Sequence, residues 1–229
     1  MNVAIIAAAG FGRRMAGERP KQFLELAGVP IIFHALKAFE RCNVIHQIVT
    51  VLAAGETDDF LSIAKEHGIQ KLVAVVPGGD TRAASVLQGL RAVGTETEVV
   101  AVHDGVRPFV TSDEITRTVQ AAELEGAAIL VSIPVDTIKE VNDGVVVRTL
   151  DRSTIRYALT PQCFHYKLLR RAYEQVDVSD AGLTDESSIV EGMGAKIVVV
   201  EGSPRNIKIT RPEDLVIGEA ILKAVSSEQ

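Results

Sequence analysis

Short, mainly apolar runs recur along the first 132 residues of the chain and alternate with segments of helical periodicity. The runs occupy residues 3–6, 47–52, 72–76, 99–103 and 127–132. Between them, apolar residues three and four positions apart indicate helices over residues 31–39, 56–67 and 83–92. Strands and helices that alternate in this way form parallel βαβ units. The sequence therefore predicts a Rossmann-like, three-layer α/β fold around a mostly parallel central sheet.

The pattern changes after residue 132. Residues 136–141 and 145–149 alternate between apolar and polar side chains around an Asn-Asp-Gly turn at 142–144, which is typical of a β-hairpin. Because an isolated two-stranded hairpin is at best marginally stable in water, it needs a surface to pack on. We therefore expect a single domain over residues 1–229, with a β-arm at about residues 134–156 that packs against a second copy of the chain.

The composition limits the class of protein. Of the 229 residues, 47% are hydrophobic and 24% are charged, and the net charge of −6 argues against non-specific nucleic-acid binding. No apolar run approaches the roughly 20 residues that span a bilayer. Cys42 and Cys163 have no metal-binding spacing, so we expect buried thiols in a reducing compartment. Since the N-terminus also lacks a basic leader segment, we expect a cytoplasmic protein without nucleic-acid or membrane partners.

A glycine-containing loop follows the first apolar run directly. Residues 7–15 read AAAGFGRRM, and a Pro-Lys-Gln sequence follows shortly afterwards. Gly10 and Gly12 lack a Cβ atom, so the backbone can turn sharply and bring its N–H groups close to an anion. Arg14 and Lys21 add positive charge near that anion. The combination indicates a polyphosphate site; the alternative is a common glycine turn beside solvated arginines.

Two other phosphate-binding motifs do not fit this loop. A P-loop requires glycine, four further residues and then Gly-Lys-Ser or Gly-Lys-Thr. A dinucleotide fingerprint requires a third glycine at the position of Met15, where it permits close packing of the helix on the strand. The loop is therefore more consistent with a ligand that carries more negative charge than NAD.

A second glycine-rich loop, Pro-Gly-Gly-Asp-Thr-Arg at residues 77–82, follows the third predicted strand. Ligands of open α/β sheets bind outside the carboxyl ends of the strands, so both loops should line one cleft. Gly79 and Asp80 belong to this loop. Ser85 lies in the first turn of the helix behind it, where its hydroxyl either caps the helix or faces the cleft. An ordinary tight turn is the alternative, but two such loops together favour a nucleotide site.

Two charged residues extend the predicted cleft. Asp104 follows the fourth strand, where a carboxylate that faces a cationic phosphate loop is well placed to bind Mg²⁺; a turn cap is the alternative. We expect His103 beside it to be structural. Lys208 falls in a predicted strand over residues 206–210, after an Asn206 expected to be exposed. Periodicity there fits a solvated lysine as well as a functional one.

Helix ends are also marked in the sequence. Residues 158–162 are expected to lead into a helix over residues 167–176, and residues 196–200 to form a further strand. The predicted caps are Thr184 for a helix that starts beside it, and capping boxes formed by Thr111 with Glu114 and by Thr210 with Glu213.

Six motifs resemble, in the same order, those of one enzyme family. They are AAAGFGRRM with the PKQ behind it, GGDTRAASV, VHDGVRPF, ALTPQ, LTDESS and NIKITRPEDL. They run from about residue 3 to about residue 222 and resemble the 2-C-methyl-D-erythritol 4-phosphate cytidylyltransferases of the non-mevalonate isoprenoid pathway. The resemblance implies an enzyme that joins CTP to 2-C-methyl-D-erythritol 4-phosphate with Mg²⁺ and releases pyrophosphate. It also implies a homodimer whose arms reach into the neighbouring subunit.

The resemblance implies roles for individual residues at matching positions. Arg14, Lys21 and Lys208 would be catalytic, and Asp104 would lie near the metal. The residues implied to contact CTP are Ala8, Ala9, Gly10, Gly12, Gly79, Asp80, Ser85 and Asp104. Those implied to surround the acceptor are Arg107, Thr137, Arg152, Thr160 and Thr184, with Arg152 serving the neighbouring subunit's site. Some members carry two alanines where this chain has Gly105 and Val106.

The predicted site suits attack by a phosphate monoester. The second pKa of such a group is about 6, so it is largely ionised at neutral pH and needs no general base. Fixed cations and a metal would stabilise the charge that gathers at the α-phosphorus and on the departing pyrophosphate. Two alternatives remain open: a cytidylyltransferase for another polyol phosphate, such as ribitol 5-phosphate, and a non-catalytic nucleotide-binding module that uses the arm for assembly.

Overall fold

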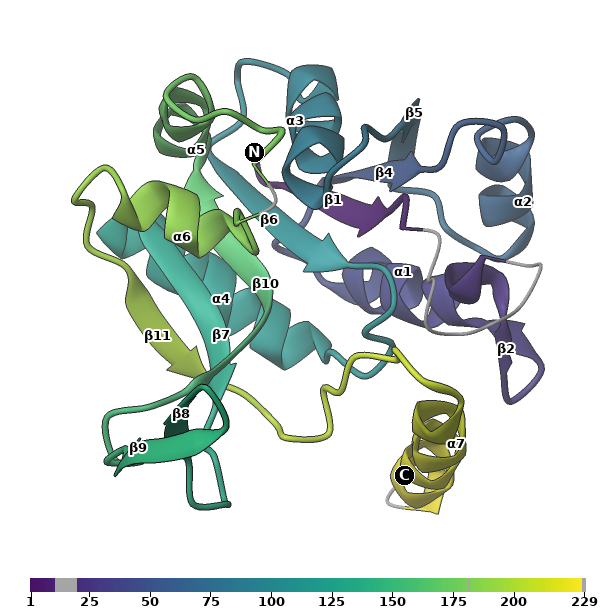
Figure 1. The fold of residues 1–229 in the computed structure, drawn as a ribbon. Coiled ribbons are helices and arrows are strands. Elements are labelled where there is room, and N and C mark those ends of the chain that lie inside the picture. Colours follow the sequence, from purple (N-terminus) through teal and green to yellow (C-terminus); the bar gives the residue numbers. More distant parts are fainter. Residues whose placement is uncertain (11–19, 181, 228–229) are drawn as a thin grey trace.

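A seven-stranded sheet forms the centre of the molecule, in the order β11-β7-β10-β6-β1-β4-β5 (Figure 1). The computed structural model describes residues 1–10, 20–180 and 182–227. Neighbouring strands pair in parallel, except that β10 runs antiparallel to both β6 and β7. The predicted mostly parallel α/β fold is therefore confirmed. The strands are β1 (Val3–Ala8), β4 (Gln47–Leu52), β5 (Leu72–Pro77), β6 (Val99–Asp104), β7 (Ala127–Ser132), β10 (Tyr157–His165) and β11 (Val198–Glu201).

Helices cover both faces of the sheet. Neighbouring residues of β1 point to opposite faces, so Ile6 joins one apolar core and Ile5 the other. Because β1, β4, β6 and β7 are buried on both faces, they read as nearly continuous apolar runs in the sequence. The helices of the first core are α1 (Ile31–Arg41), α2 (Phe60–Glu66) and α4 (Ser112–Glu125), and those of the second are α3 (Arg82–Ala92), α5 (Tyr166–Tyr173) and α6 (Glu186–Glu191).

A smaller apolar cluster lies beyond the carboxyl end of β6. It contains Leu26, Ile31, Val106 and Ile209, all buried. The backbone N–H of Ile209 donates to the carbonyl of Val106 at 2.9 Å, which holds the irregular segment before α7 against the end of β6. The short elements around this cluster are η2 (Lys21–Phe23), β2 (Glu25–Leu26), β3 (Val29–Pro30) and α7 (Pro212–Ser227).

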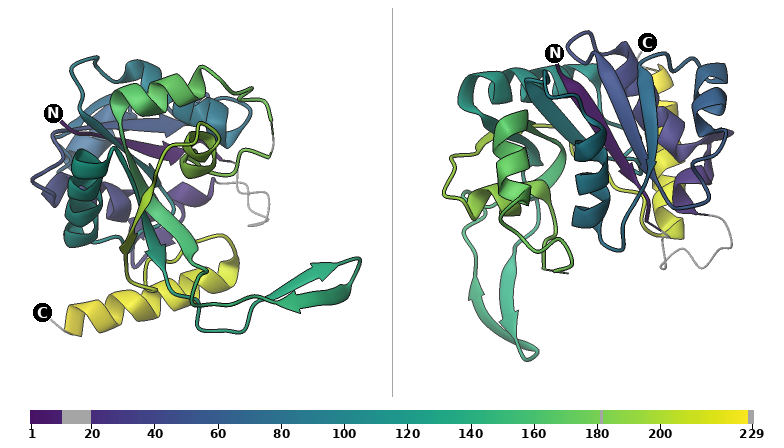
Figure 2. Two further views of the ribbon diagram at one scale, coloured as in Figure 1. Left: turned by 90° about the vertical axis from the view of Figure 1, so that its left-hand side faces the viewer. Right: turned by 90° about the horizontal axis from the view of Figure 1, so that it is seen from above.

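The predicted hairpin is confirmed as β8 (Lys139–Asn142) paired with β9 (Val145–Thr149). Asp143 and Gly144 have φ angles of +47° and +78°, as a two-residue type I′ turn requires. Figure 2 shows the arm projecting from the body of the molecule. Four of its valines, Val141, Val145, Val146 and Val147, are exposed.

Strand β10 was not predicted from the sequence. It contains residues 158–162 and lies between β6 and β7, in the interior of the sheet. Pro161 has no N–H to donate, which normally argues against an interior strand. Here the register of pairing with β7 shifts between Ala158 and Gln162, so the proline falls at an irregularity of the ladder. The helix that follows, α5, ends at Tyr173 rather than at residue 176.

The predicted strand over residues 206–210 is wrong, because this segment is irregular. The expectation that Asn206 is exposed is also wrong, since it is 0% exposed. Its side-chain Nδ2 donates to the carbonyl of Thr160 at 3.0 Å. A buried amide that finds a partner 46 residues away leaves no periodic signal in the sequence.

Two of the three predicted caps differ in the structure. Asp185, not Thr184, caps α6, and its carboxylate accepts from the N–H of Ser188. At the start of α7, the N–H and hydroxyl of Thr210 donate to Asp214 instead of Glu213. The capping box of Thr111 and Glu114 at α4 is confirmed.

Two further element boundaries are shifted from the predicted positions, and the predicted state of the cysteines is confirmed. Helix α2 begins at Phe60, later than the predicted residue 56, and β11 spans residues 198–201 rather than 196–200. Cys42 and Cys163 are buried free thiols, as expected. Among the helices of the described chain, none combines the length and apolar character needed to cross a bilayer.

His103 is a structural residue in the centre of the sheet. Its Nε2 lies 3.1 Å from the carbonyl of Arg107, and because a carbonyl only accepts, this nitrogen carries the proton. Its Nδ1 therefore accepts from the hydroxyl of Thr160, at 2.9 Å. The same hydroxyl oxygen accepts from the N–H of Asp104. Burial lowers the pKa of His103 to about 4, so the imidazole is neutral at physiological pH.

We expect His103 to make the fold sensitive to acid. The pKa is about 4 in the folded chain and about 6.5 in the unfolded one. Between these values the unfolded state binds more protons, so stability falls with decreasing pH. The loss approaches about 1.4 kcal/mol per pH unit. The unfolding free energy, measured with urea from pH 7 to pH 4.5, should therefore fall less steeply in His103→Gln than in the wild type. Equal slopes would contradict this role, and His46→Gln, at an exposed histidine, is the matched control.

Candidate active site

A cavity of about 580 Å³ opens at the carboxyl ends of β1, β5 and β6. Strand ends that meet at one edge of the sheet bring the two predicted loops together, as expected for an open α/β sheet. The sequence-predicted residues that line the cavity are Ala8, Ala9, Gly10, Lys21, Gly79, Asp80, Ser85, Asp104 and Lys208. The lining also includes Ala7, Gln22, Thr81, Arg82 and Val106.

The loop after β5 approaches the loop after β1 closely at Gly78. A Cβ atom at this position would lie 2.3 Å from the Cβ of Ala9 and 2.8 Å from the hydroxyl of Ser85. Any side chain would therefore push the two loops apart. Ser85 does not cap α3, because Thr81 does, through its hydroxyl and the N–H of Ala84. The Ser85 hydroxyl instead donates to the carbonyl of Thr81 and accepts from the N–H of Gly79, which fixes the turn that faces the cavity.

The first loop is described as far as Gly10. This residue lines the cavity, and a Cβ built on it would meet no described atom within 4 Å. No described side chain or backbone atom therefore contacts this side of Gly10. Gly12 and Arg14, predicted to contact and stabilise the phosphates, lie outside the described residues, so their roles stay predictions.

Asp104 holds three cations at the floor of the cavity. Its Oδ1 accepts from Nη2 and Nε of Arg82 at 3.1 and 3.2 Å, and its Oδ2 lies 2.9 Å from Nζ of Lys208. Nε of Arg107 is 3.6 Å from the same Oδ2. Burial alone would raise the pKa of Asp104, but the attraction of Arg82, and then of Lys208 and Arg107, outweighs it and holds the pKa well below its usual range. The carboxylate is therefore ionised at any physiological pH.

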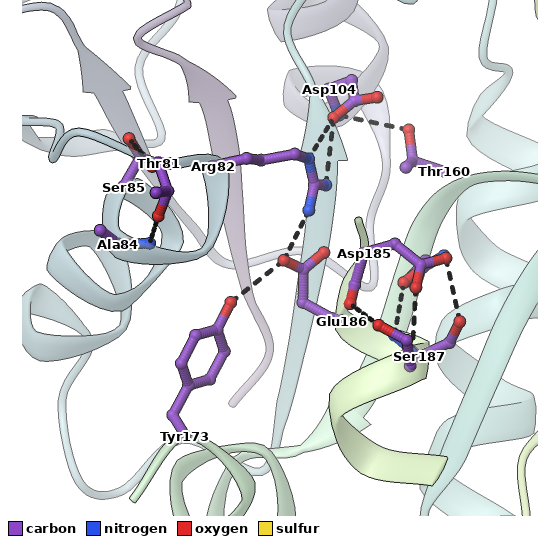
Figure 3. A network of polar contacts seen from close by, with 12 residues as sticks. Thr81, Arg82, Ala84, Ser85, Asp104, Thr160, Tyr173, Asp185, Glu186 and Ser187 are labelled. Atoms are coloured by element: carbon purple, nitrogen blue, oxygen red, sulfur yellow. Dashed lines mark hydrogen bonds and ion pairs between the residues drawn. The ribbon is translucent and has the colours of Figure 1, made fainter. Parts of the chain in front are cut away.

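Arg82 joins this carboxylate to a second one, on Glu186. Its Nη1 donates to Oε1 of Glu186 at 2.7 Å, and the hydroxyl of Tyr173 donates to the same oxygen at 3.1 Å. Figure 3 shows the guanidinium lying between the two acids. Burial opposes the charge of Arg82, but Glu186 and then Asp104 attract it more strongly, so its pKa is raised.

Sequence reasoning did not select Arg82, Glu186 or Tyr173. Arg82 carries a visible signal, because it is a cation in the first turn of a helix directly behind a glycine loop. Glu186 lies 104 residues from Arg82, and Tyr173 sits in an amphipathic helix as an ordinary core residue would. Neither of these two could be connected to the cleft before the fold was known.

None of the residues predicted to surround the acceptor substrate is among the described residues that line the cavity. Arg107 and Thr160 surround Asp104 instead: Nη1 of Arg107 donates to the carbonyl of Asn206, and Thr160 is 4% exposed. Thr184 is exposed beside α6. Thr137 and Arg152 lie at the base of the arm, where Nη1 of Arg152 donates to the carbonyl of Val135 at 2.7 Å.

Asp80 and Asp104 are the carboxylates among the described residues that line the cavity. In the described part of the chain, no group of three or more His, Cys, Asp and Glu side chains is arranged to hold a metal. Both oxygens of Asp104 already face cations. One or two carboxylates do not hold Mg²⁺ alone. They fit the ion where phosphate oxygens of a bound substrate supply further ligands, as in other phosphate-transferring enzymes.

The lining is suited to binding anions and stabilising negative charge. Lys21, Arg82 and Lys208 line the same cavity as residues 7–10 of the first loop. Among the described lining residues there is no histidine or cysteine, and the Ser85 hydroxyl is committed to backbone groups. The cavity is therefore not arranged for a serine or cysteine nucleophile activated by a histidine, and reaction within it would depend on positioning and charge stabilisation.

Comparisons with known proteins agree over nearly the whole chain. Residues 2–224 match the profile of the 2-C-methyl-D-erythritol 4-phosphate cytidylyltransferase family. A protein of that name from Pelotomaculum thermopropionicum is 44% identical over 224 residues, covering 96% of this chain and 94% of its own. Its counterpart from Geobacter metallireducens is 43% identical over 226 residues, with 96% and 97% covered.

Solved structures show the same similarity in three dimensions. The 4-diphosphocytidyl-2C-methyl-D-erythritol synthase of Anaerococcus prevotii superimposes with a TM-score of 0.85 at 32% identity, covering 97% of this chain and 96% of its own. The cytidylyltransferase of Thermus thermophilus gives a TM-score of 0.79 at 30% identity, with 97% and 100% covered. As the six motifs predicted, the chain belongs to the 2-C-methyl-D-erythritol 4-phosphate cytidylyltransferase family.

Proposed function

We propose that the cavity at the ends of β1, β5 and β6 is where this enzyme transfers a cytidylyl group from CTP to 2-C-methyl-D-erythritol 4-phosphate. The observation that carries the proposal is the group of cations in this cavity: Arg82 and Lys208 are held by Asp104, and Lys21 lines the same cavity. A phosphate oxygen of the acceptor attacks the α-phosphorus of CTP. The bond from that phosphorus to the oxygen bridging to the β-phosphate breaks, and pyrophosphate leaves with the electron pair.

The triphosphate is proposed to lie against the first loop. Ala8, Ala9 and Gly10 line the cavity, and Lys21 borders it as well. Gly12 and Arg14 follow directly in the sequence and would complete this binding site. The cytosine and ribose would then contact Gly79, Asp80 and Ser85, whose turn is fixed by hydrogen bonds before any ligand binds.

The acceptor phosphate is proposed to bind beside Lys208. The Lys208 side chain is 36% exposed and its amine lies on Asp104, so the amine can contact a phosphate from a fixed position. Arg107, Thr160 and Thr184 would support the acceptor side. Thr160 would do so through its hydrogen bond to the N–H of Asp104. The acceptor is largely ionised at neutral pH, so no residue is needed to remove a proton from it.

Mg²⁺ is proposed to enter with the triphosphate, with Asp104 as the protein group nearest to it. When bound, the ion neutralises part of the charge on the phosphates and on the departing pyrophosphate. Lys21, Arg14 and Lys208 would stabilise the remaining charge. Each acts most strongly on charge that develops during the reaction, because fixed cations gain most where negative charge increases.

The arm is proposed to join two copies of the single domain. It carries the exposed Val141, Val145, Val146 and Val147, and a two-stranded hairpin of this size needs a surface to pack on. A closed dimer would cover these side chains and place Thr137 and Arg152 of the partner subunit at the acceptor side. The buried free thiols are consistent with a reducing compartment, and we propose a cytoplasmic location.

Turnover assays test the catalytic roles. We expect pyrophosphate release with CTP and 2-C-methyl-D-erythritol 4-phosphate to exceed that with the other three nucleoside triphosphates, and that with ribitol 5-phosphate as acceptor.

Lys21→Ala, Arg14→Ala and Lys208→Ala should each lower turnover by about 10²-fold, because each removes a charge that stabilises the transition state. Lys65→Ala, at an exposed lysine of α2, is the matched control. Faster turnover with ribitol 5-phosphate would reassign the acceptor, and near-normal turnover in the lysine variants would refute their roles.

Mixing two inactive variants tests the arm. Lys208→Ala removes a residue from its own subunit's site, whereas Arg152→Ala is expected to impair acceptor binding in the neighbour while sparing CTP. Heterodimers of the two variants contain one intact site. Refolding an equal mixture should therefore restore about a quarter of wild-type activity if subunits pair at random in a two-fold dimer. Activity no greater than the mean of the two variants, in a sample shown to be dimeric, would place Arg152 in its own subunit's site.

A further inference from the structure

A chain of contacts leads from helix α5 to the cavity through residues that do not line it. The Tyr173 hydroxyl donates to Oε1 of Glu186 at 3.1 Å, and Nη1 of Arg82 donates to the same oxygen at 2.7 Å. The opposite side of the Arg82 guanidinium binds Oδ1 of Asp104. The other Asp104 oxygen lies 2.9 Å from Nζ of Lys208.

Glu186 is itself rigidly placed. It is the first residue of α6, directly after the Asp185 cap, and is 0% exposed. The Asp185 carboxylate accepts from Nε2 of Gln162 at 2.8 Å, and Oε1 of Gln162 accepts from the N–H of Ser187. These bonds attach the start of α6 to the neighbouring strand β10. Glu186 therefore offers its carboxylate to Arg82 from a fixed point in the scaffold.

The planar guanidinium of Arg82 couples the position of Glu186 to the orientation of Asp104. Its donors form a rigid fork, so binding acids on two sides fixes both its plane and its rotation. With Nε and Nη2 both on Oδ1 of Asp104, the carboxylate is oriented with Oδ2 toward Lys208. If Nη1 lost its anionic partner, the guanidinium could turn toward the cavity, where 25% of the side chain is already exposed.

Glu186 also balances charge. Arg82, Arg107 and Lys208 surround Asp104, so these four groups carry a net charge of +2, which Glu186 reduces to +1. Without it, Arg82 would become an additional ligand for a phosphate group. The nucleotide could then bind well while the acceptor lysine was misplaced.

We infer that Glu186, supported by Tyr173, is a positioning residue of the transfer reaction: it holds Arg82 on Asp104 and thereby sets the place of Lys208. This inference rests on the proposed function of Lys208. Glu186→Gln is a suitable variant, because Oε1 can still accept both hydrogen bonds. The amide nitrogen can occupy the place of Oε2, a buried oxygen to which no described group donates. The substitution removes the charge, keeps the size of the side chain and exchanges this oxygen for an N–H donor.

The first test is a kinetic double-mutant cycle. Glu186→Gln should lower kcat about tenfold and leave KM for CTP within about twofold, because it displaces a group that acts in the transition state. Tyr173→Phe should lower kcat about two- to threefold, and Glu191→Gln, an exposed acid of the same helix, should have no effect. In a Lys208→Ala background, Glu186→Gln should cost less than about twofold more, since its effect passes through Lys208.

A merely structural role gives a different result. If Glu186→Gln only destabilised the fold, the melting temperature would fall, while kcat per folded molecule would stay at the wild-type value. If Glu186 acted independently of Lys208, the two losses would multiply. Either result overturns the inference while leaving wild-type cytidylyl transfer, and so the proposed function, intact.

Crystal structures of the wild type and of Glu186→Gln provide a readout independent of activity. We expect the Arg82 guanidinium to turn toward the cavity, and Nζ of Lys208 to change its place relative to Oδ2 of Asp104, in the variant alone. An unchanged arrangement of Arg82, Asp104 and Lys208 would refute the positioning role. If the wild type released no pyrophosphate with CTP and the acceptor, the proposed function would fail, and this comparison would still decide whether Glu186 sets the place of Lys208.

Discussion

The buried carboxylate of Asp104 joins the elements around the cavity. It attracts Arg82 from α3, Lys208 from the segment before α7 and Arg107 from the turn after β6. The N–H of Asp104 donates to Thr160 of β10, which adds the antiparallel strand to the same cluster. Four parts of the chain thus meet at Asp104, three of them through its carboxylate and the fourth through its backbone N–H.

A buried ion cluster of this kind is an expensive way to stabilise a fold, because the desolvation of several charges can exceed their mutual attraction. Its benefit lies in placing cations. Phosphoryl transfer requires positive groups that are already in position when charge moves from the α-phosphorus to the leaving pyrophosphate, and groups that need not reorganise are the most effective. We propose that Asp104 and Glu186 are the anions that hold these cations in place in this cytidylyltransferase.

Sequence and structure agree best where a residue's role is local. β1, β4, β6 and β7 are buried on both faces, so they appear as apolar runs, and the arm appears through alternation and an Asp-Gly turn. The loop residues that line the cavity were predicted for the same reason, because a strand end and a loop composition are visible in any one sequence. The first loop beyond Gly10 lies outside the described residues.

What the sequence did not predict depends on partners distant along the chain. β10 carries Thr160, Pro161 and Gln162, which look unsuited to an interior strand until Thr160 meets Asp104 and Gln162 meets Asp185. Asn206 looked exposed because its partner is a carbonyl of that same unpredicted strand. The family resemblance selected Lys208, but periodicity alone could not distinguish it from a solvated lysine, because its partner Asp104 is distant in the sequence. Periodicity reports which face of an element is buried, but it does not report which polar groups meet there.

The proposed binding of CTP in the cavity around Asp104 is tested most directly by a crystal structure of the protein with CTP and Mg²⁺. We expect the triphosphate against the backbone of residues 8–10 and Lys21, and the cytosine against the turn at residues 79–85, with Lys208 still on Asp104. A nucleotide bound elsewhere on the molecule, or a Lys208 that leaves Asp104 when CTP binds, would contradict this proposal.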